Sequence, residues 1–136
     1  MNFFSALLIV LSLAFVNVAF TQDHLVIDEI SPKSSYDNIY VEKLYGDSLS
    51  SGFLIWVKDT VKTHRHNWHS ESIIVLEGAG KLYTNGNVQV ITSGQTIFIP
   101  KKTWHAVKVT STIPLKVLSI QSPGFYGKDR EFENEK

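Results

Sequence analysis

The chain of 136 residues contains no cysteine, and its single methionine is the first residue. A disulfide framework and a cysteine-ligated metal site are therefore both excluded. Lysine and arginine together number 13, as do aspartate and glutamate, so the formal net charge is zero. Because the chain has no net charge, it has no global field that would attract a polyanion, and we expect no nucleic-acid partner.

Charged side chains are missing from the beginning of the chain, where the first one is Asp23. The apolar run before it predicts a secretory signal peptide over residues 1–21. An uncleaved membrane anchor is the alternative, since the run approaches the length that spans a bilayer. We therefore expect an exported protein, periplasmic or secreted, that meets a membrane only if this segment is not removed. Residues 22–136 should form one domain.

A helical repeat of apolar residues is also lacking after that segment. Short β-prone runs alternate instead with turn residues, at a spacing of about 8 to 12 residues. Asn85 and Gly86 form a dipeptide suited to a type I′ turn, so residues 81–84 and 88–92 should be antiparallel neighbours. These features predict an all-β fold, either a sandwich or a single antiparallel β-barrel.

Two ends of the predicted domain are less regular. Residues 25–30 suit a short strand or strap. The C-terminal tail begins at about residue 122, and its cluster of charges of both signs at residues 128–136 predicts a solvated and frayed terminus. The other expected strands lie at 39–45, 52–57, 61–66, 72–76, 81–84, 88–92, 95–99, 104–110 and 115–121.

The most informative stretch is residues 64–78, H-R-H-N-W-H-S-E-S-I-I-V-L-E-G. Alternate residues of a strand face the same side, so His64 and His66 present their rings side by side, as in a metal site. Glu71 is an odd number of residues beyond His66, so the chain must bend between them before the carboxylate can join the rings. One hairpin would then offer two nitrogens and an oxygen. His105, which ends the segment G-Q-T-I-F-I-P-K-K-T-W-H, is a fourth candidate.

A structural role for these four side chains is the alternative to metal binding. Gathering them inside a small apolar barrel without an ion would cost several kcal/mol, because buried polar groups need partners. Metal binding is therefore the better hypothesis.

The two segments resemble the two sequence motifs of the cupin family. This resemblance implies a single antiparallel β-barrel or jelly roll, with His64, His66, Glu71 and His105 as metal ligands. The pattern H-x-H, four residues, E, six residues, G is matched by His64, His66, Glu71 and Gly78, and the pattern G, five residues, P, four residues, H by Gly94, Pro100 and His105.

The identity of the ion stays open. Three imidazoles and a carboxylate on an octahedral ion leave two positions free, which suits Fe, Mn, Ni or Co, whereas the same ligands can close a tetrahedral Zn site. Oxygen chemistry in this site would involve Fe, Mn or Cu.

Several other side chains are candidates for the chemistry. His69 lies within the bend and can orient a ligand or contact substrate, and Tyr83 can act as a general acid if its hydroxyl reaches the substrate. These two are the candidate catalytic residues. Trp56, Trp68 and Trp104 are candidates for a substrate pocket that stacks on sugar or aromatic faces. The alternative for His69 is a hydrogen-bonded structural histidine. The alternative for the aromatic residues is a place in the core.

The resemblance implies a metal-dependent enzyme that acts on a small oxygenated molecule, such as a sugar, a uronate or a hydroxy acid. The ion would act as a Lewis acid in an isomerase- or lyase-type reaction. A metal-dependent dioxygenase or oxidase is one alternative, and a non-catalytic exported metal- or ligand-binding module is the other. By the same resemblance we expect a homodimer in which residues 25–30 are exchanged or shared.

Overall fold

The computed structural model describes residues 24–133. The expected signal peptide or anchor at residues 1–21 lies outside this part, so its existence stays a prediction. Within the described part, no helix has the length and hydrophobicity needed to cross a bilayer.

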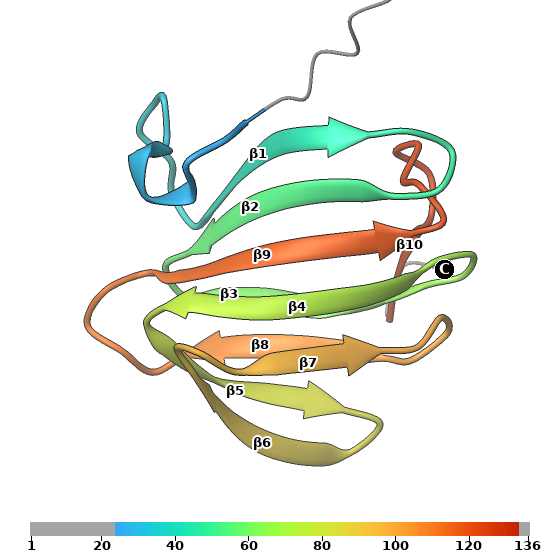
Figure 1. Ribbon diagram of the computed structural model, residues 1–136. Helices are drawn as coiled ribbons and strands as arrows, with labels where there is room; N and C mark the ends of the chain where they lie inside the picture. Colours follow the sequence, from blue (N-terminus) through green and yellow to red (C-terminus); the bar gives the residue numbers. More distant parts are fainter. Residues whose placement is uncertain (1–23, 134–136) are drawn as a thin grey trace, which may run out of the picture.

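Nearly all regular structure is β. Two five-stranded antiparallel sheets pack one behind the other (Figure 1), with strand order β1-β2-β9-β4-β7 in sheet A and β10-β3-β8-β5-β6 in sheet B. The predicted all-β jelly roll is confirmed. The elements are η1 (Ile27–Glu29), β1 (Ile39–Gly46), β2 (Ser51–Val57), β3 (Thr60–His66), β4 (Ser70–Glu77), β5 (Ala79–Thr84), β6 (Asn87–Thr92), β7 (Thr96–Ile99), β8 (His105–Val109), β9 (Leu115–Ser122) and β10 (Arg130–Phe132).

The core lies between the two sheets and is built by alternation. In β4, residues at odd positions from Glu71 to Val75 are buried, and those between them are partly exposed. This period of two is what a strand covered on one face requires. The buried apolar cluster consists of Val57, Ile73, Val75, Leu82, Ile91, Ile99, Val107, Val109, Leu115 and Val117.

Two turns show why particular residues occur where they do. Asn85 and Gly86 both have positive φ angles, 45° and 84°, and join β5 to β6 as the predicted hairpin. Gly78 has a φ of 77°, and a Cβ at this position would lie 2.7 Å from the carbonyl oxygen of Pro114. The last glycine of the first motif is therefore required by the backbone.

The predicted hairpin of ligands is wrong. β3 pairs with β8 and β10 in sheet B, whereas β4 pairs with β9 and β7 in sheet A. The bend between them is a corner at which the chain passes from one sheet to the other. It places the histidines of β3 and the carboxylate of Glu71 on facing inner surfaces rather than on neighbouring strands.

The segment expected as a strand or strap at residues 25–30 forms no strand. It contains one 3₁₀ turn, η1, whose side chains are not buried. Asp28 and Glu29 interrupt the apolar pattern, so a strand here would have no continuous apolar face to bury. It lies near the outer face of sheet A, where the carbonyl oxygen of Ile27 accepts a hydrogen bond of 3.4 Å from Lys116 Nζ.

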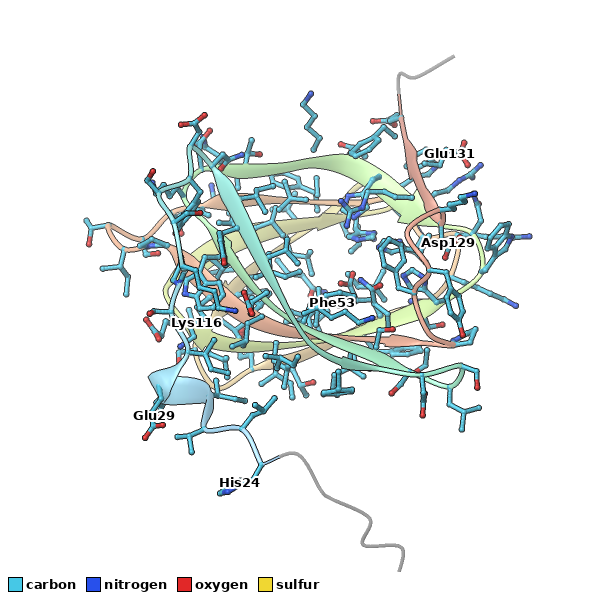
Figure 2. All side chains as sticks on the ribbon, turned by 90° about the horizontal axis from the view of Figure 1, so that it is seen from above. His24, Glu29, Phe53, Lys116, Asp129 and Glu131 are labelled. Atoms are coloured by element: carbon cyan, nitrogen blue, oxygen red, sulfur yellow. The ribbon has the colours of Figure 1, made fainter. Side chains whose placement is uncertain are left out.

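The prediction of a frayed C-terminal tail is also wrong for the described residues. β10 pairs with β3, and the side chain of Arg65 donates two hydrogen bonds of 3.0 Å to the carboxylate of Glu131. Asp129 and Glu131 lie at the opposite end of the molecule from Glu29 (Figure 2). The carboxylate of Glu131 thus helps to dock the tail on sheet B.

Candidate metal centre

Three histidines converge between the sheets. His64 and His66 end β3 and His105 begins β8, and the register of these strands pairs His64 with His105. The ring centre of His64 lies 4.1 Å from that of His105 and 5.1 Å from that of His66. All three side chains are buried, and one nitrogen from each lies within 4.8 Å of the others. This cluster could hold a metal ion.

The backbone fixes which ring nitrogens face the centre. His64 Nδ1 lies 2.8 Å from the carbonyl oxygen of Lys62, and His105 Nδ1 lies 2.9 Å from that of Thr103. Because a carbonyl only accepts hydrogen bonds, each Nδ1 carries the proton, which leaves a lone pair on Nε2. Imidazole ligands of metals are oriented in this way.

Several of these nitrogens are buried without a partner. Among the described residues, Nε2 of His105 and both ring nitrogens of His66 receive no hydrogen bond and donate none. Leaving buried polar atoms unpaired is costly, and a cation bound by one nitrogen of each imidazole would reduce that cost. The donor set therefore fits a divalent ion.

Glu71 supplies the oxygen of the set from the opposite sheet. Its Oε2 lies 3.6 Å from His66 Nε2 and 3.5 Å from His105 Nε2, while Oε1 accepts a hydrogen bond from the hydroxyl of Ser119. Gln121 Nε2 lies 3.4 Å from the same oxygen. Ser119 and Gln121 thus hold the carboxylate with Oε2 facing the imidazoles.

The protonation states suit a cation. Burial lowers the pKa of His64 to about 3, and the neighbouring His105 adds to this effect. Burial alone would raise the pKa of Glu71, but interactions with His105, His66 and Ser119 outweigh it and hold that pKa well below its ordinary value. At neutral pH the centre therefore presents unprotonated nitrogen and an ionised carboxylate.

His69 belongs to a neighbouring buried pair. Its Nδ1 lies 2.6 Å from Asp129 Oδ2, and its ring centre lies 4.1 Å from that of His66. The Asp129 carboxylate also accepts hydrogen bonds from the backbone N–H groups of Asn67, Trp68 and His69. Asp129 was missed by sequence reasoning, because its charged neighbours made it look like part of a solvated tail.

A cavity of about 90 Å³ adjoins the centre. It is lined by His64, Glu71 and His105, by Arg130, and by aliphatic side chains of both sheets. Two aliphatic lining residues, Ile39 and Val41 of β1, are 41% and 49% exposed, and Arg130 of β10 is also exposed. Since β1 and β10 are edge strands, the cavity opens to solvent along these edges.

The predicted aromatic pocket residues do not line this cavity. Trp56 lies on the outer face of sheet A, with its ring centre 5.8 Å from that of Tyr40. Trp104 lies on the outer side of sheet B, where Cζ of Arg65 is 4.6 Å from the centre of the Trp104 ring. Trp68 is 69% exposed at the corner between the sheets. The assignment of the three tryptophans to a substrate pocket stays a prediction, and none of them lines the cavity beside the centre.

Tyr83 also points away from the centre. It pairs with Ala106 of β8, whereas the neighbouring Leu82 faces inward and is buried. The hydroxyl of Tyr83 is therefore on the outer face of sheet B, and its proposed role as a general acid stays a prediction.

Comparison with known proteins shows what the chain is similar to. The family model described as Cupin domain matches residues 53–121. A protein of Aquifex aeolicus described as uncharacterized is 35% identical over 97 residues, which cover 71% of this chain and 79% of that protein. A mannose-1-phosphate guanylyltransferase of Klebsiella pneumoniae is 36% identical over 64 residues, which cover 47% of this chain but only 14% of that protein.

Solved structures share the same architecture. An uncharacterized conserved protein with a double-stranded beta-helix domain from Klebsiella pneumoniae superposes with a TM-score of 0.71 at 15% identity. The match covers 85% of this chain and all of the other. At this identity the likeness concerns the fold alone.

Proposed function

Because the chain belongs to the cupin family, we propose that it is a metal-dependent enzyme acting on a small oxygenated molecule by isomerase- or lyase-type chemistry. The substrate class is a sugar, a uronate or a hydroxy acid. The observation that carries this proposal is the convergence of three buried imidazoles and the carboxylate of Glu71 beside an open cavity.

His64, His66, Glu71 and His105 are the residues that would hold the ion, which is Fe, Mn, Ni, Co, Cu or Zn. When bound, a divalent ion supplies Lewis acidity toward substrate oxygens. The chain supplies the rest of the environment. Ser119 and Gln121 orient the carboxylate of Glu71. The aliphatic lining makes the surroundings of the centre less polar than water, which strengthens electrostatic interactions inside the cavity.

His69 is positioned to act on the centre through His66. It is buried between Asp129 and His66, and it does not line the cavity. Its Nδ1–H is donated to Asp129, which fixes the ring against that of His66. The proposed role of His69 is therefore to hold His66 in place.

The similarity to part of mannose-1-phosphate guanylyltransferases supports a sugar-related role. The chain matches a small share of those proteins, so their whole activity is not carried over. Localisation outside the cytoplasm and assembly into a homodimer remain part of the proposal.

The test begins with the metal content of residues 22–136, purified without chelator, beside a His64→Ala/His66→Ala double variant. We expect about one ion per chain in the parent protein and none in the double variant, because two of four ligands are gone. A His24→Ala variant is the control, since this histidine lies outside the centre. A parent protein that holds no ion and cannot be loaded would remove the basis of the proposal.

A substrate panel of sugars, uronates and hydroxy acids follows, with and without oxygen. Turnover that needs no oxygen supports the isomerase or lyase class. Oxygen consumption that depends on substrate would instead indicate a dioxygenase or oxidase. Tight binding without turnover would indicate a non-catalytic module.

A further inference from the structure

Arg130 lies on the same face of sheet B as the histidine ligands. It begins β10 and is directly opposite His66 in the antiparallel pair of β10 with β3. Directly opposite residues of such a pair project to the same side of the sheet. In agreement with this register, Arg130 lines the cavity together with His64, Glu71 and His105.

The two acidic neighbours of Arg130 in the sequence, both labelled in Figure 2, are engaged elsewhere. Asp129 turns toward His69 and the backbone of the corner, and Glu131 is paired with Arg65 on the outer face. Within residues 24–133, no carboxylate forms an ion pair with Arg130. The guanidinium is therefore available to a ligand in the cavity.

The charges of the cavity favour an anion. Glu71 contributes one negative charge, a divalent ion would contribute two positive charges, and Arg130 adds one more. Aliphatic side chains form the rest of the wall, and in such surroundings charge interactions are less screened than in water. A ligand bearing a negative group would balance this excess.

We propose that Arg130 is a specificity-determining residue that binds the carboxylate of the substrate at the mouth of the cavity. The inference rests on the proposed function and narrows it to uronates and hydroxy acids rather than neutral sugars. A guanidinium matches a carboxylate with two parallel hydrogen bonds, which sets its orientation as well as its affinity.

A carboxylate fits better than a phosphate. Phosphate sites commonly use backbone N–H groups at a helix N-terminus or in a nest of turns. The cavity lining within the described residues comes from strands and includes no helix N-terminus, and Arg130 is its one arginine or lysine.

The test compares matched ligands by calorimetric titration of the Zn-loaded protein. Lactate is compared with propane-1,2-diol, and glucuronate with glucose, because the members of each pair differ in the carboxylate. The variants are Arg130→Gln, which removes the charge, and Arg130→Lys, which keeps the charge without the planar fork. Lys128→Gln removes the same charge from an exposed neighbour and is the control.

We expect the carboxylates to bind more tightly than their neutral partners, and Arg130→Gln to weaken carboxylate binding about 10- to 100-fold, as for loss of a charge-assisted hydrogen bond. The affinity of Arg130→Lys for carboxylates should lie between those of the parent protein and Arg130→Gln, and the affinity of Lys128→Gln should equal that of the parent protein. Neutral ligands should bind all variants alike.

Two measurements separate this inference from the proposed function. Zinc content and the unfolding midpoint are recorded for every variant, and both should be unchanged in Arg130→Gln. If zinc is held but the parent shows no carboxylate preference, or Arg130→Gln keeps it, the role of Arg130 is wrong and the metal centre stands. If sn-glycerol 3-phosphate binds more tightly than lactate, the carboxylate assignment is wrong. If zinc is not held, the proposed function fails first.

Discussion

His69 Nδ1 lies 2.6 Å from Asp129 Oδ2, although the two residues are 60 positions apart in the chain. This buried contact joins the corner between β3 and β4 to the segment that leads into β10. It therefore ties the ligand-bearing strand and the C-terminal tail into one unit.

Replacing Asp129 with Asn should destabilise the protein by about 2–4 kcal/mol, since breaking a buried, hydrogen-bonded pair leaves donors unpaired. The amide NH₂ of Asn would face backbone N–H groups that the carboxylate now satisfies. Urea unfolding monitored by tryptophan fluorescence measures the loss. An exposed carboxylate in η1 provides the control, and Asp28→Asn should change stability little. Equal stabilities of the two variants would show that the contact contributes nothing.

Metal binding should stabilise the fold, because the ligand set is assembled only in the folded chain. At an ion concentration 100 times the Kd, the expected gain is about 2.7 kcal/mol. A thermal melt with and without added Zn²⁺ should show an upward shift in Tm. The His64→Ala/His66→Ala variant should show none. A similar shift in that variant would mean that the ion binds elsewhere.

Acid should destabilise the metal-free protein. The folded-state pKa values of His64 and His69 are lowered to about 3 and about 4, so between those values and the ordinary value of 6.5 the unfolded chain binds more protons than the folded one. The unfolding free energy should therefore fall as pH falls from 6.5 toward 4, by about 1.4 kcal/mol per pH unit for each histidine. Urea titrations at several pH values measure the slope. A flat profile over this range would contradict neutral, buried rings.

Gly78→Ala should destabilise more than Gly86→Ala. Both positions have a positive φ, which a Cβ disfavours by roughly 1 kcal/mol, but only Gly78 has a backbone oxygen within 2.7 Å of the added atom. Nothing lies within 4 Å of a Cβ at Gly86. The difference between their unfolding free energies isolates the steric contact. If the unfolding free energies of the two variants fall by the same amount, the close approach to Pro114 is relieved without cost.

The homodimer expected from the family resemblance can be tested through the N-terminal segment. Leu25 and Val26 are exposed apolar side chains next to η1, and a partner subunit would cover them. Light scattering of residues 22–136 should give a dimer mass, and Leu25→Asp/Val26→Asp should shift it toward a monomer. A monomer at high concentration in the parent protein would remove the expectation.

Local patterns were sufficient to predict strands β1 to β9 and the ligand candidates. The alternation in β4, the Asn85–Gly86 turn and the spacing of His64 and His66 all reflect interactions between residues close in sequence. What they could not provide was pairing between distant segments. The change of sheet after β3 depends on which strands are neighbours, and a sequence pattern with a period of two does not specify neighbours.

The C-terminal residues show the same limit. Their charges have mixed signs, which is typical of a solvated end, and only the position of Arg65 and of the corner N–H groups gives Glu131 and Asp129 a specific role. The outward direction of Trp56 and Tyr83 likewise follows from strand register rather than from closeness to a ligand in the sequence.

The pairing of β10 with β3 brings two parts of the chain that are distant in sequence to one site. The ligand candidates come from β3, β4 and β8, whereas Arg130 comes from a three-residue edge strand that contributes no ligand. Under the proposed role of Arg130, substitutions in that short strand would change which ligands the cavity binds and would leave the four ligand candidates unchanged. If Arg130 binds the ligand as proposed, the residues that hold the ion and the residue that selects the ligand lie on different strands, so related chains could differ in ligand choice through β10 alone.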